Sequence, residues 1–304
     1  QSPMNLRRRS KNDWGRLGMT SEWRTIRAAD FIDFNPRLSL KKGDIATKVA
    51  MDKLKPFTKK IPETEKAEFN GGAKFCNGDT VMARITPCLE NGKTAYVDML
   101  DDGEIGFGST EFIVMRAKTG ISDPQFVYYT AINPVFRNVA VKSMVGSSGR
   151  QRVQQSVLEE LELSVPDLDE QRRIGDFLAK IDEKIALNDR INDNLEQQAQ
   201  SYFQELFVDN ADPEWTTGTI SDLGTVVGGS TPSKAKPEYY TESGIAWITP
   251  KDLSNNKSKF VSHGENDITE LGLRNSSASI MPEGTVLFSS RAPIGYIAIA
   301  AGEV

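Results

Sequence analysis

One long segment without helix breakers constrains how this chain can fold. Residues 169–207 contain no proline, and their one glycine lies in the second turn. Ten positions spaced alternately by four and three form the a and d seam of a coiled coil, and eight of the ten are apolar or aromatic: Ile174, Leu178, Ile181, Ile185, Asn188, Asn192, Leu195, Ala199, Tyr202 and Leu206. Such a helix would be about 58 Å long. The spacing predicts a spacer, whereas a core helix, the alternative, usually carries a wider apolar face.

Composition indicates a globular protein of about two domains around this helix. The 304 residues are 38% apolar and 26% charged, and no apolar run approaches the 18 residues of a membrane span. Residues 4–20 are polar and basic, without a secretory apolar core. Cys76 and Cys88 lack metal-site spacing, which favours reduced packing residues. We therefore predict a cytoplasmic protein.

Charge is unevenly distributed along the chain. Residues 1–60 hold fifteen Lys or Arg against six Asp or Glu, whereas residues 167–214 hold five against thirteen. A basic globular region followed by an acidic helix suggests that the first meets a polyanion and the second meets protein. A solvated surface would show similar charge runs, so this observation alone decides little.

Turn signals and short apolar runs define the first domain, residues 21–165, which follows a basic lead-in, residues 1–20, predicted to be disordered. Gly-Asp, Asn-Gly and Asp-Asp-Gly turns separate the runs, which predicts strands and hairpins. We expect strands over residues 80–85, 94–98 and 112–116 and helices over 124–139 and 153–158, and a further run over residues 163–165 leads into Pro166. The spacer helix then occupies residues 166–210.

Residues 211–304 resemble a second, incomplete copy of the first domain. Trp23 is followed seven residues later by Asp30, and Trp215 by Asp222. Further on, Gly78-Asp79-Thr80-Val81-Met82 matches Glu283-Gly284-Thr285-Val286-Leu287. The predicted fold is mixed α/β (α+β): a globular domain, a long coiled-coil helix, and a second domain that lacks its last third or more.

The order of these elements, together with their sequence motifs, resembles the specificity (S) subunit of type I restriction-modification systems over residues 20–304. The densest match runs from Gly149-Arg150-Gln151-Arg152-Val153 through Val165-Pro166 and Glu170-Gln171 into the long helix. Ser109-Thr110-Glu111-Phe112 and Gly229-Ser230-Thr231-Pro232 also look like that family. Each element is weak alone, but the ordered series is specific.

The resemblance implies a non-catalytic subunit that binds double-stranded DNA. Each of two target recognition domains would read half of a bipartite site, and helices between them would act as ruler and docking surface. The partners implied are methyltransferase (M) and restriction (R) subunits, which would use S-adenosylmethionine, ATP and Mg; none of these cofactors is expected in this chain. The family has a second helix that this sequence lacks.

Catalytic motifs can be proposed but do not hold. A metal-nuclease pattern would use Asp182 and Lys184, which lie about 200° apart on the predicted helix and cannot converge. Asn133-Pro134-Val135-Phe136 is similar to an adenine-methylase loop, but no Gly-rich nucleotide loop precedes it, so we interpret it as a helix interior. His263 is the only histidine and is too far from both cysteines to support a triad.

Binding chemistry remains. Lysines near the start of the first domain could neutralise phosphates, and polar side chains in Gly-flanked turns could read base edges. The DNA-binding candidates are Lys41, Lys42, Lys53, Arg84, Thr86, Asn91, Lys93, Ser147, Ser148, Arg150 and Gln151, with Lys48, Lys55, Lys59 and Lys60 as further phosphate contacts. For any one of them, an exposed loop residue without function is an equal alternative.

Two hypotheses follow from these observations. The first is a specificity subunit that directs methylation and restriction. The second is a coiled-coil scaffold whose globular ends contact only proteins. The seam is symmetric about position 190, so we also expect an antiparallel homodimer in which Ile174 opposes Leu206 and Asn188 opposes Asn192.

Overall fold

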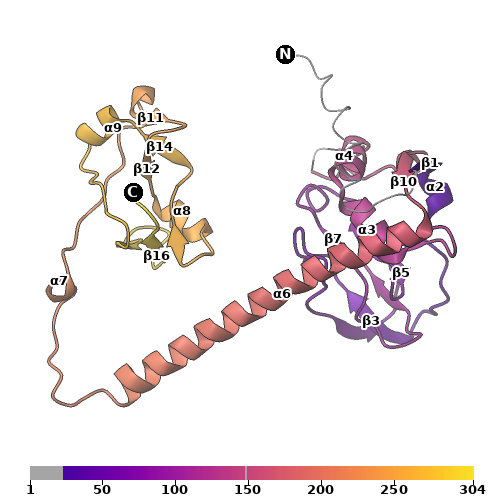
Figure 1. Ribbon diagram of the computed structural model, residues 1–304, viewed down its shortest axis with the longest axis horizontal. Coiled ribbons are helices and arrows are strands. Elements are labelled where there is room, and N and C mark those ends of the chain that lie inside the picture. The colour runs from indigo at the N-terminus through magenta and orange to yellow at the C-terminus, as the bar shows by residue number, and fades with distance from the viewer. Residues whose placement is uncertain (1–22, 148) are drawn as a thin grey trace. The chain divides into compact units, whose positions relative to one another are not determined.

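A computed structural model describes residues 23–147 and 149–304 of the chain. The predicted disordered lead-in, residues 1–20, lies outside the described residues, as does Ser148. The chain divides into two units, Gln1–Glu205 and Leu206–Val304 (Figure 1). In the described part of the chain, no helix combines the length and apolar composition needed to cross a membrane.

The first unit is built on two four-stranded sheets. One is antiparallel, in the order β2 (Ile32–Phe34), β9 (Phe112–Ala117), β6 (Thr80–Ala83), β7 (Thr94–Tyr96). The other is mixed, in the order β4 (Glu65–Glu68), β3 (Ile45–Val49), β8 (Gly106–Gly108), β5 (Ala73–Phe75), with β3 and β8 parallel. A two-stranded sheet pairs β1 (Arg24–Arg27) with β10 (Glu162–Val165). The strands predicted from residues 80, 94 and 112 are confirmed, and the run over residues 163–165 forms most of β10.

The side chains of the antiparallel sheet point alternately to its two faces, and both faces are buried. Met82 and Ile113 face the helices α2 (Ala28–Phe31), α3 (Pro124–Ile132), α4 (Pro134–Lys142) and α5 (Gln155–Glu159). Val81 and Val114 face the mixed sheet and pack with Phe75. This double burial explains why strand β6 has no exposed residue.

The helix predicted over residues 124–139 is wrong in one respect: it is two helices, α3 and α4, divided at Asn133. Asn133 has extended backbone (φ −56°, ψ 133°), and its side chain accepts a hydrogen bond from Val135 N at 2.8 Å. Pro134 lacks an N–H and disfavours helical backbone in the residue before it. Asn133 therefore caps a new helix rather than lying inside one.

The long helix α6 runs over Leu168–Gln204, and a π-helical turn follows over Glu205–Asp209. Asp167 caps its start by accepting the Glu170 N–H at 2.9 Å, and two acidic residues in the first turn suit the positive end of the helix dipole. The predicted long helix is confirmed. Its 37 residues correspond to about 55 Å.

Only the first part of α6 packs on the unit. Gln171 is fully buried; its Oε1 accepts from Asp123 N at 3.0 Å, and its Nε2 donates to Pro166 O at 3.0 Å. At Gly175 a Cβ atom would lie 2.9 Å from Asp123 Oδ1, so a glycine permits the close approach to α3. From Leu187 to Gln204, every residue of α6 is exposed.

The second unit contains two three-stranded sheets around a small core. One is ordered β11 (Tyr240–Thr241), β14 (Asn266–Ile268), β12 (Ile245–Trp247); the other is β13 (Phe260–Val261), β16 (Ile297–Ala300), β15 (Val286–Phe288). Its helices are α7 (Ile220–Leu223), α8 (Pro250–Asn255) and α9 (Glu270–Arg274). Its core combines three alanines, Ala246, Ala298 and Ala300, with larger residues such as Leu253 and Ile268.

The two units share a hairpin, but in a register one residue from the predicted one. Gly78 and Gly284 both have positive φ, and both donate their N–H across the hairpin at 2.9 Å, to Val97 O and Ala300 O. Gly78 therefore corresponds to Gly284, not to Glu283. In this register Met82 corresponds to Phe288, and each lies on the equivalent face of its own sheet.

Candidate nucleic-acid interface

Two loops of the first unit that hold predicted DNA-binding residues lie against each other. The turn over residues 84–93 follows β6, and the hairpin over residues 145–152 follows α4. Thr86 N donates to Gln151 O at 3.0 Å, and Val153 N donates to Arg84 O at 2.8 Å. The structure thus brings Gln151 together with Arg84 and Thr86, although Gln151 lies more than sixty residues after them in sequence.

The hairpin projects its tip into solvent. Val145 and Arg152 exchange both backbone hydrogen bonds, at 3.0 and 2.8 Å, and Arg150 N closes the tip on Ser147 O at 3.0 Å. Gly146 has a φ of +137°, and a Cβ there would lie 2.9 Å from Arg150 O, so the tight tip requires glycine. Ser147 and Arg150 are exposed, as residues that contact a ligand must be.

Glu111 and Arg152 form an ion pair between the two loops. Arg152 Nη2 donates to Glu111 Oε1 at 2.6 Å and its Nε to Oε2 at 3.0 Å, a bidentate pair. The hydrogen bond from Arg152 holds the pKa of Glu111 below its usual range. Arg84 N also donates to the Glu111 carbonyl at 2.9 Å. Neither Glu111 nor Arg152 was predicted to be a site residue, and their only signal in the sequence is that both lie in motifs that resemble the family.

Two buried polar atoms of this turn have no hydrogen-bond partner among the described residues. They are Arg84 Nε and Thr86 Oγ1. A buried donor or acceptor left unpaired costs about 1 to 3 kcal/mol. Both belong to residues that we predicted to contact DNA, but the two atoms are themselves buried, so a ligand could reach them only if the turn rearranged.

Asn91 and Lys93 lie at the far end of the same turn. The turn is closed by Asn91 N donating to Pro87 O at 3.0 Å, and the Asn91 side chain is exposed. Lys93 Nζ donates to Met51 O at 3.0 Å. An ammonium group has three donors, so Lys93 keeps capacity for a further acceptor.

The predicted phosphate-binding lysines have different surroundings. Lys41, Lys42, Lys55 and Lys60 are exposed. Lys48 pairs with Glu65 at 2.7 Å, and Lys53 pairs with Glu63, whose hydrogen bond raises the pKa of Lys53. Exposed pairs of this kind are weak, so a phosphate could replace either carboxylate.

Lys59 does not fit the predicted phosphate role. Its Nζ lies 4.9, 5.3 and 5.5 Å from the ring centres of Tyr129, Tyr96 and Tyr128, and it donates to Tyr129 Oη at 3.1 Å. Burial lowers the pKa of Lys59. Tyr129 in turn donates to Asp182 of α6 at 2.6 Å, so this cluster anchors the helix.

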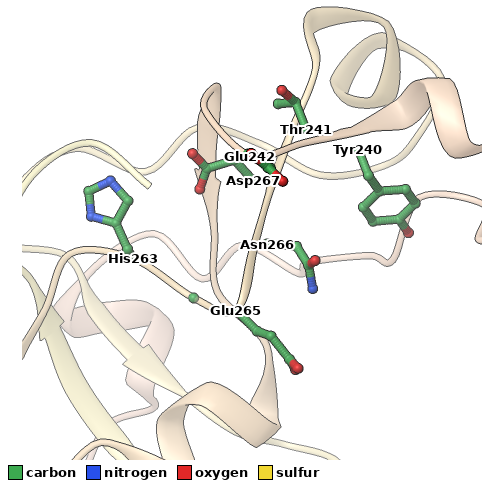
Figure 2. Close-up of a pocket in the computed structure, with 8 residues that line it drawn as sticks. Tyr240, Thr241, Glu242, His263, Glu265, Asn266 and Asp267 are labelled. Carbon is green, nitrogen blue, oxygen red and sulfur yellow. The ribbon is translucent and has the colours of Figure 1, made fainter. Parts of the chain in front are cut away.

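The second unit has a hollow of about 380 Å³ beside β14 (Figure 2). Its lining includes three acidic residues, Glu242, Glu265 and Asp267, together with His263. Such a lining repels phosphate. No group of three or more metal-ligating side chains is placed to hold an ion anywhere in residues 23–147 and 149–304. We assign no site to this hollow.

Comparison with known proteins identifies the family. The family model described as "Type I restriction modification DNA specificity domain" matches residues 21–197 and 213–304. The chain belongs to this family. It is 46% identical over 101 residues to the specificity subunit of the type I restriction enzyme MjaIX of Methanocaldococcus jannaschii, covering 33% of this chain and 23% of that protein.

Other members of this family differ more in sequence. The HindI specificity subunit of Haemophilus influenzae is 23% identical over 298 residues, which cover 73% of this chain and 63% of that protein. The solved HsdS subunit from Thermoanaerobacter tengcongensis is 20% identical, with a TM-score of 0.45 over 92% of this chain and 74% of that chain. The chain thus spans less than two thirds of the curated relatives named here.

Proposed function

We propose that this chain is a DNA-recognition subunit of a type I restriction-modification complex and is itself non-catalytic. The observation that carries the proposal is the joined pair of loops, residues 84–93 and 145–152, in a member of this DNA specificity family. Their exposed Arg, Asn and Ser side chains are of the types that read base edges and phosphates.

The domain roles are part of the proposal. Residues 21–165 would form one target recognition domain, residues 166–210 the spacer helix, and residues 211–304 part of a second recognition domain. Methyltransferase (M) and restriction (R) subunits would bring S-adenosylmethionine, ATP and Mg, and the complex would work on DNA in the cytoplasm. The relatives that this chain matches are named as specificity subunits of restriction enzymes, which supports these partners.

The exposed seam of α6 supports pairing with a second helix. Ile185 and Leu195 are 54% and 57% exposed, and Ile181 and Tyr202 are exposed as well. Ile174 instead packs against the core of its own unit, which leaves Leu178 and Tyr202 as the outermost pair of the predicted register. We propose an antiparallel homodimer centred on residue 190, in which the exposed asparagines at 188 and 192 face each other.

Selection from a random pool of duplexes tests the function. The full chain would be purified with methyltransferase subunits and used to capture DNA over several rounds. We expect enrichment of a defined sequence, split into two parts if two recognition domains act together. An unenriched pool would favour a coiled-coil scaffold that contacts only proteins.

A further inference from the structure

Phe57 is an aromatic residue that the first unit holds out in solvent. Its side chain is 73% exposed, although burial of a phenyl ring is favourable. Its backbone has a φ of +52°, in the left-handed region that bulky residues avoid. The exposed ring and the strained backbone both reduce the stability of the folded state. Residues with strained backbone cluster at functional sites.

Contacts from two other segments fix the ring in this position. Phe57 N donates to Gly92 O at 3.0 Å. A Cβ on Gly92 would lie 2.6 Å from Cε1 of the ring, so only glycine leaves the ring its place. Arg137 of α4 lies over the ring, with Cζ 5.2 Å from its centre, and Arg137 Nη2 donates to Glu90 O. The ring is therefore pre-positioned.

The ring lies against the 84–93 turn of the candidate interface. Gly92 lies between Asn91 and Lys93, two of the predicted DNA contacts, in the turn that begins at Arg84. The exposed cations Lys55 and Lys60 lie within three residues of Phe57 in the chain. A basic and amide-bearing surrounding suits a nucleic acid better than an apolar protein partner.

We propose that Phe57 is a base-contacting residue that supplies apolar surface to the DNA, either by entering a base step or by packing on a thymine methyl group. A phenyl ring has no hydrogen-bonding group, and bases offer it only their faces and the methyl of thymine. Gly92 and Arg137 are its positioning residues. The inference rests on the proposed function and adds a contact that the polar candidates do not provide.

The test compares Phe57→Ala with wild type on the duplex obtained by selection and on a scrambled duplex. We expect affinity for the selected duplex to fall about 5- to 100-fold, the range for loss of one aromatic contact with a base. Binding to the scrambled duplex and the dependence on salt should not change, because no charge is removed. Phe57→Trp should retain most of the preference.

Two further variants separate the contact from effects on folding. Val135→Ala removes another apolar side chain, 70% exposed on α4, and should leave binding unchanged. Gly92→Ala displaces the ring without removing it and should weaken binding to the selected duplex in the same direction as Phe57→Ala. Circular dichroism would confirm that the variants are folded.

Two probes distinguish the sources of the contact. A 2-aminopurine scan should show a rise in fluorescence at one step with wild type and not with Phe57→Ala if the ring enters the stack. Replacing thymine by uracil should reproduce the loss if the ring packs on a methyl group.

Equal binding of wild type and Phe57→Ala to the selected duplex would overturn the inference and leave the proposed function standing. Loss of methyltransferase binding with unchanged duplex binding would overturn it too, because Phe57 would then contact protein. If wild type itself prefers no duplex, the proposed function fails with it.

Discussion

At the scale of single residues, the tip of the 145–152 hairpin is the most accessible part of the candidate interface. Arg150 is exposed there, and its guanidinium has five donors in a fixed fork that matches the edge of guanine. Glu111 and Arg152 hold the base of the same hairpin. The base of the hairpin is therefore held by an ion pair, and its exposed tip is accessible to base edges.

Arg150→Ala should weaken the selected duplex by about 1 to 3 kcal/mol more than a scrambled duplex, the cost of one lost base contact. Fluorescence anisotropy with both duplexes measures the difference. Lys42→Ala, in the exposed turn before β3, is a matched control that should weaken both duplexes alike. Equal losses for Arg150→Ala would assign Arg150 to the phosphates.

Glu104 makes the stability of the first unit depend on pH. Burial would raise its pKa, but hydrogen bonds from Lys66, Thr47 and the backbone of Asp101 lower it to about 2. An unfolded glutamate has a pKa of about 4.3. Because the folded value is the lower one, the stabilisation is present above the unfolded pKa and is lost as pH falls toward 2.

Glu104→Gln should therefore lower the free energy of unfolding at pH 7, by about 1 to 3 kcal/mol, since charge-assisted hydrogen bonds are lost. It should also flatten the loss of stability between about pH 5 and 2. Urea denaturation at several pH values checks both. An unchanged slope with pH would mean that other carboxylates govern acid unfolding.

Some of these residues could be predicted from sequence and others could not. Turn signals and short apolar runs were sufficient for β6, β7 and β9. Asn133 was misplaced because the apolar pattern continues across the break, although Pro134 was a warning. The role of Lys59 depends on tyrosines from β7 and α3, which only tertiary folding brings around one ammonium.

At the scale of elements, α6 has two parts with different surroundings: the first packs on its unit, and the later part is exposed. Its first turns are fixed to α3 through Gln171, Gly175 and the Tyr129–Asp182 hydrogen bond. The heptad pattern predicted one seam for the whole helix, but Ile174 packs into the domain core. The exposed seam further along is available to another helix.

Gly175→Ala should destabilise the first unit by about 1 to 3 kcal/mol, because the added methyl group overpacks the contact with Asp123 and Gln125. In an unpacked helix the same change would stabilise by about 1 kcal/mol. Arg190→Ala, on the exposed part of α6 and outside the seam, is the control and should be close to neutral. A gain in thermal stability for Gly175→Ala would show that the close approach imposes no constraint.

Leu178→Cys with Tyr202→Cys should form a disulfide between two chains if α6 pairs antiparallel. The native thiols Cys76 and Cys88 are free and would first be replaced by serine. Non-reducing electrophoresis and light scattering measure the cross-link and the mass. Efficient cross-linking of Leu178→Cys alone would indicate parallel pairing, and a monomer in light scattering would contradict the homodimer.

At the scale of the whole molecule, the two units contain an equivalent hairpin, β6–β7 in the first and β15–β16 in the second. One face of this hairpin is covered in the first unit and exposed in the second. In the first unit, α3 packs over this face of the sheet, where Tyr128 meets Tyr96 at 6.1 Å between ring centres. On the equivalent face of the second unit, the described residues leave Val286, Phe288 and Ile297 exposed. We therefore expect the second unit, in this chain alone, to be the less stable of the two.

Limited proteolysis of the full chain should cut between residues 209 and 304 before it cuts between residues 23 and 165. The small core of the second unit opens at lower free energy, and proteases act on opened backbone. Mass spectrometry of early fragments locates the cuts. Equal resistance of both units would contradict this difference in stability.

An equilibrium titration measures whether this chain recognises a DNA sequence. The chain, together with the proposed methyltransferase subunits, would be titrated against the selected and the scrambled duplex at about 50 and 200 mM salt. We predict a preference of at least about 1000-fold for the selected duplex, and weaker binding of both duplexes at the higher salt concentration. Equal affinity for the two duplexes, unchanged by salt, would contradict the account.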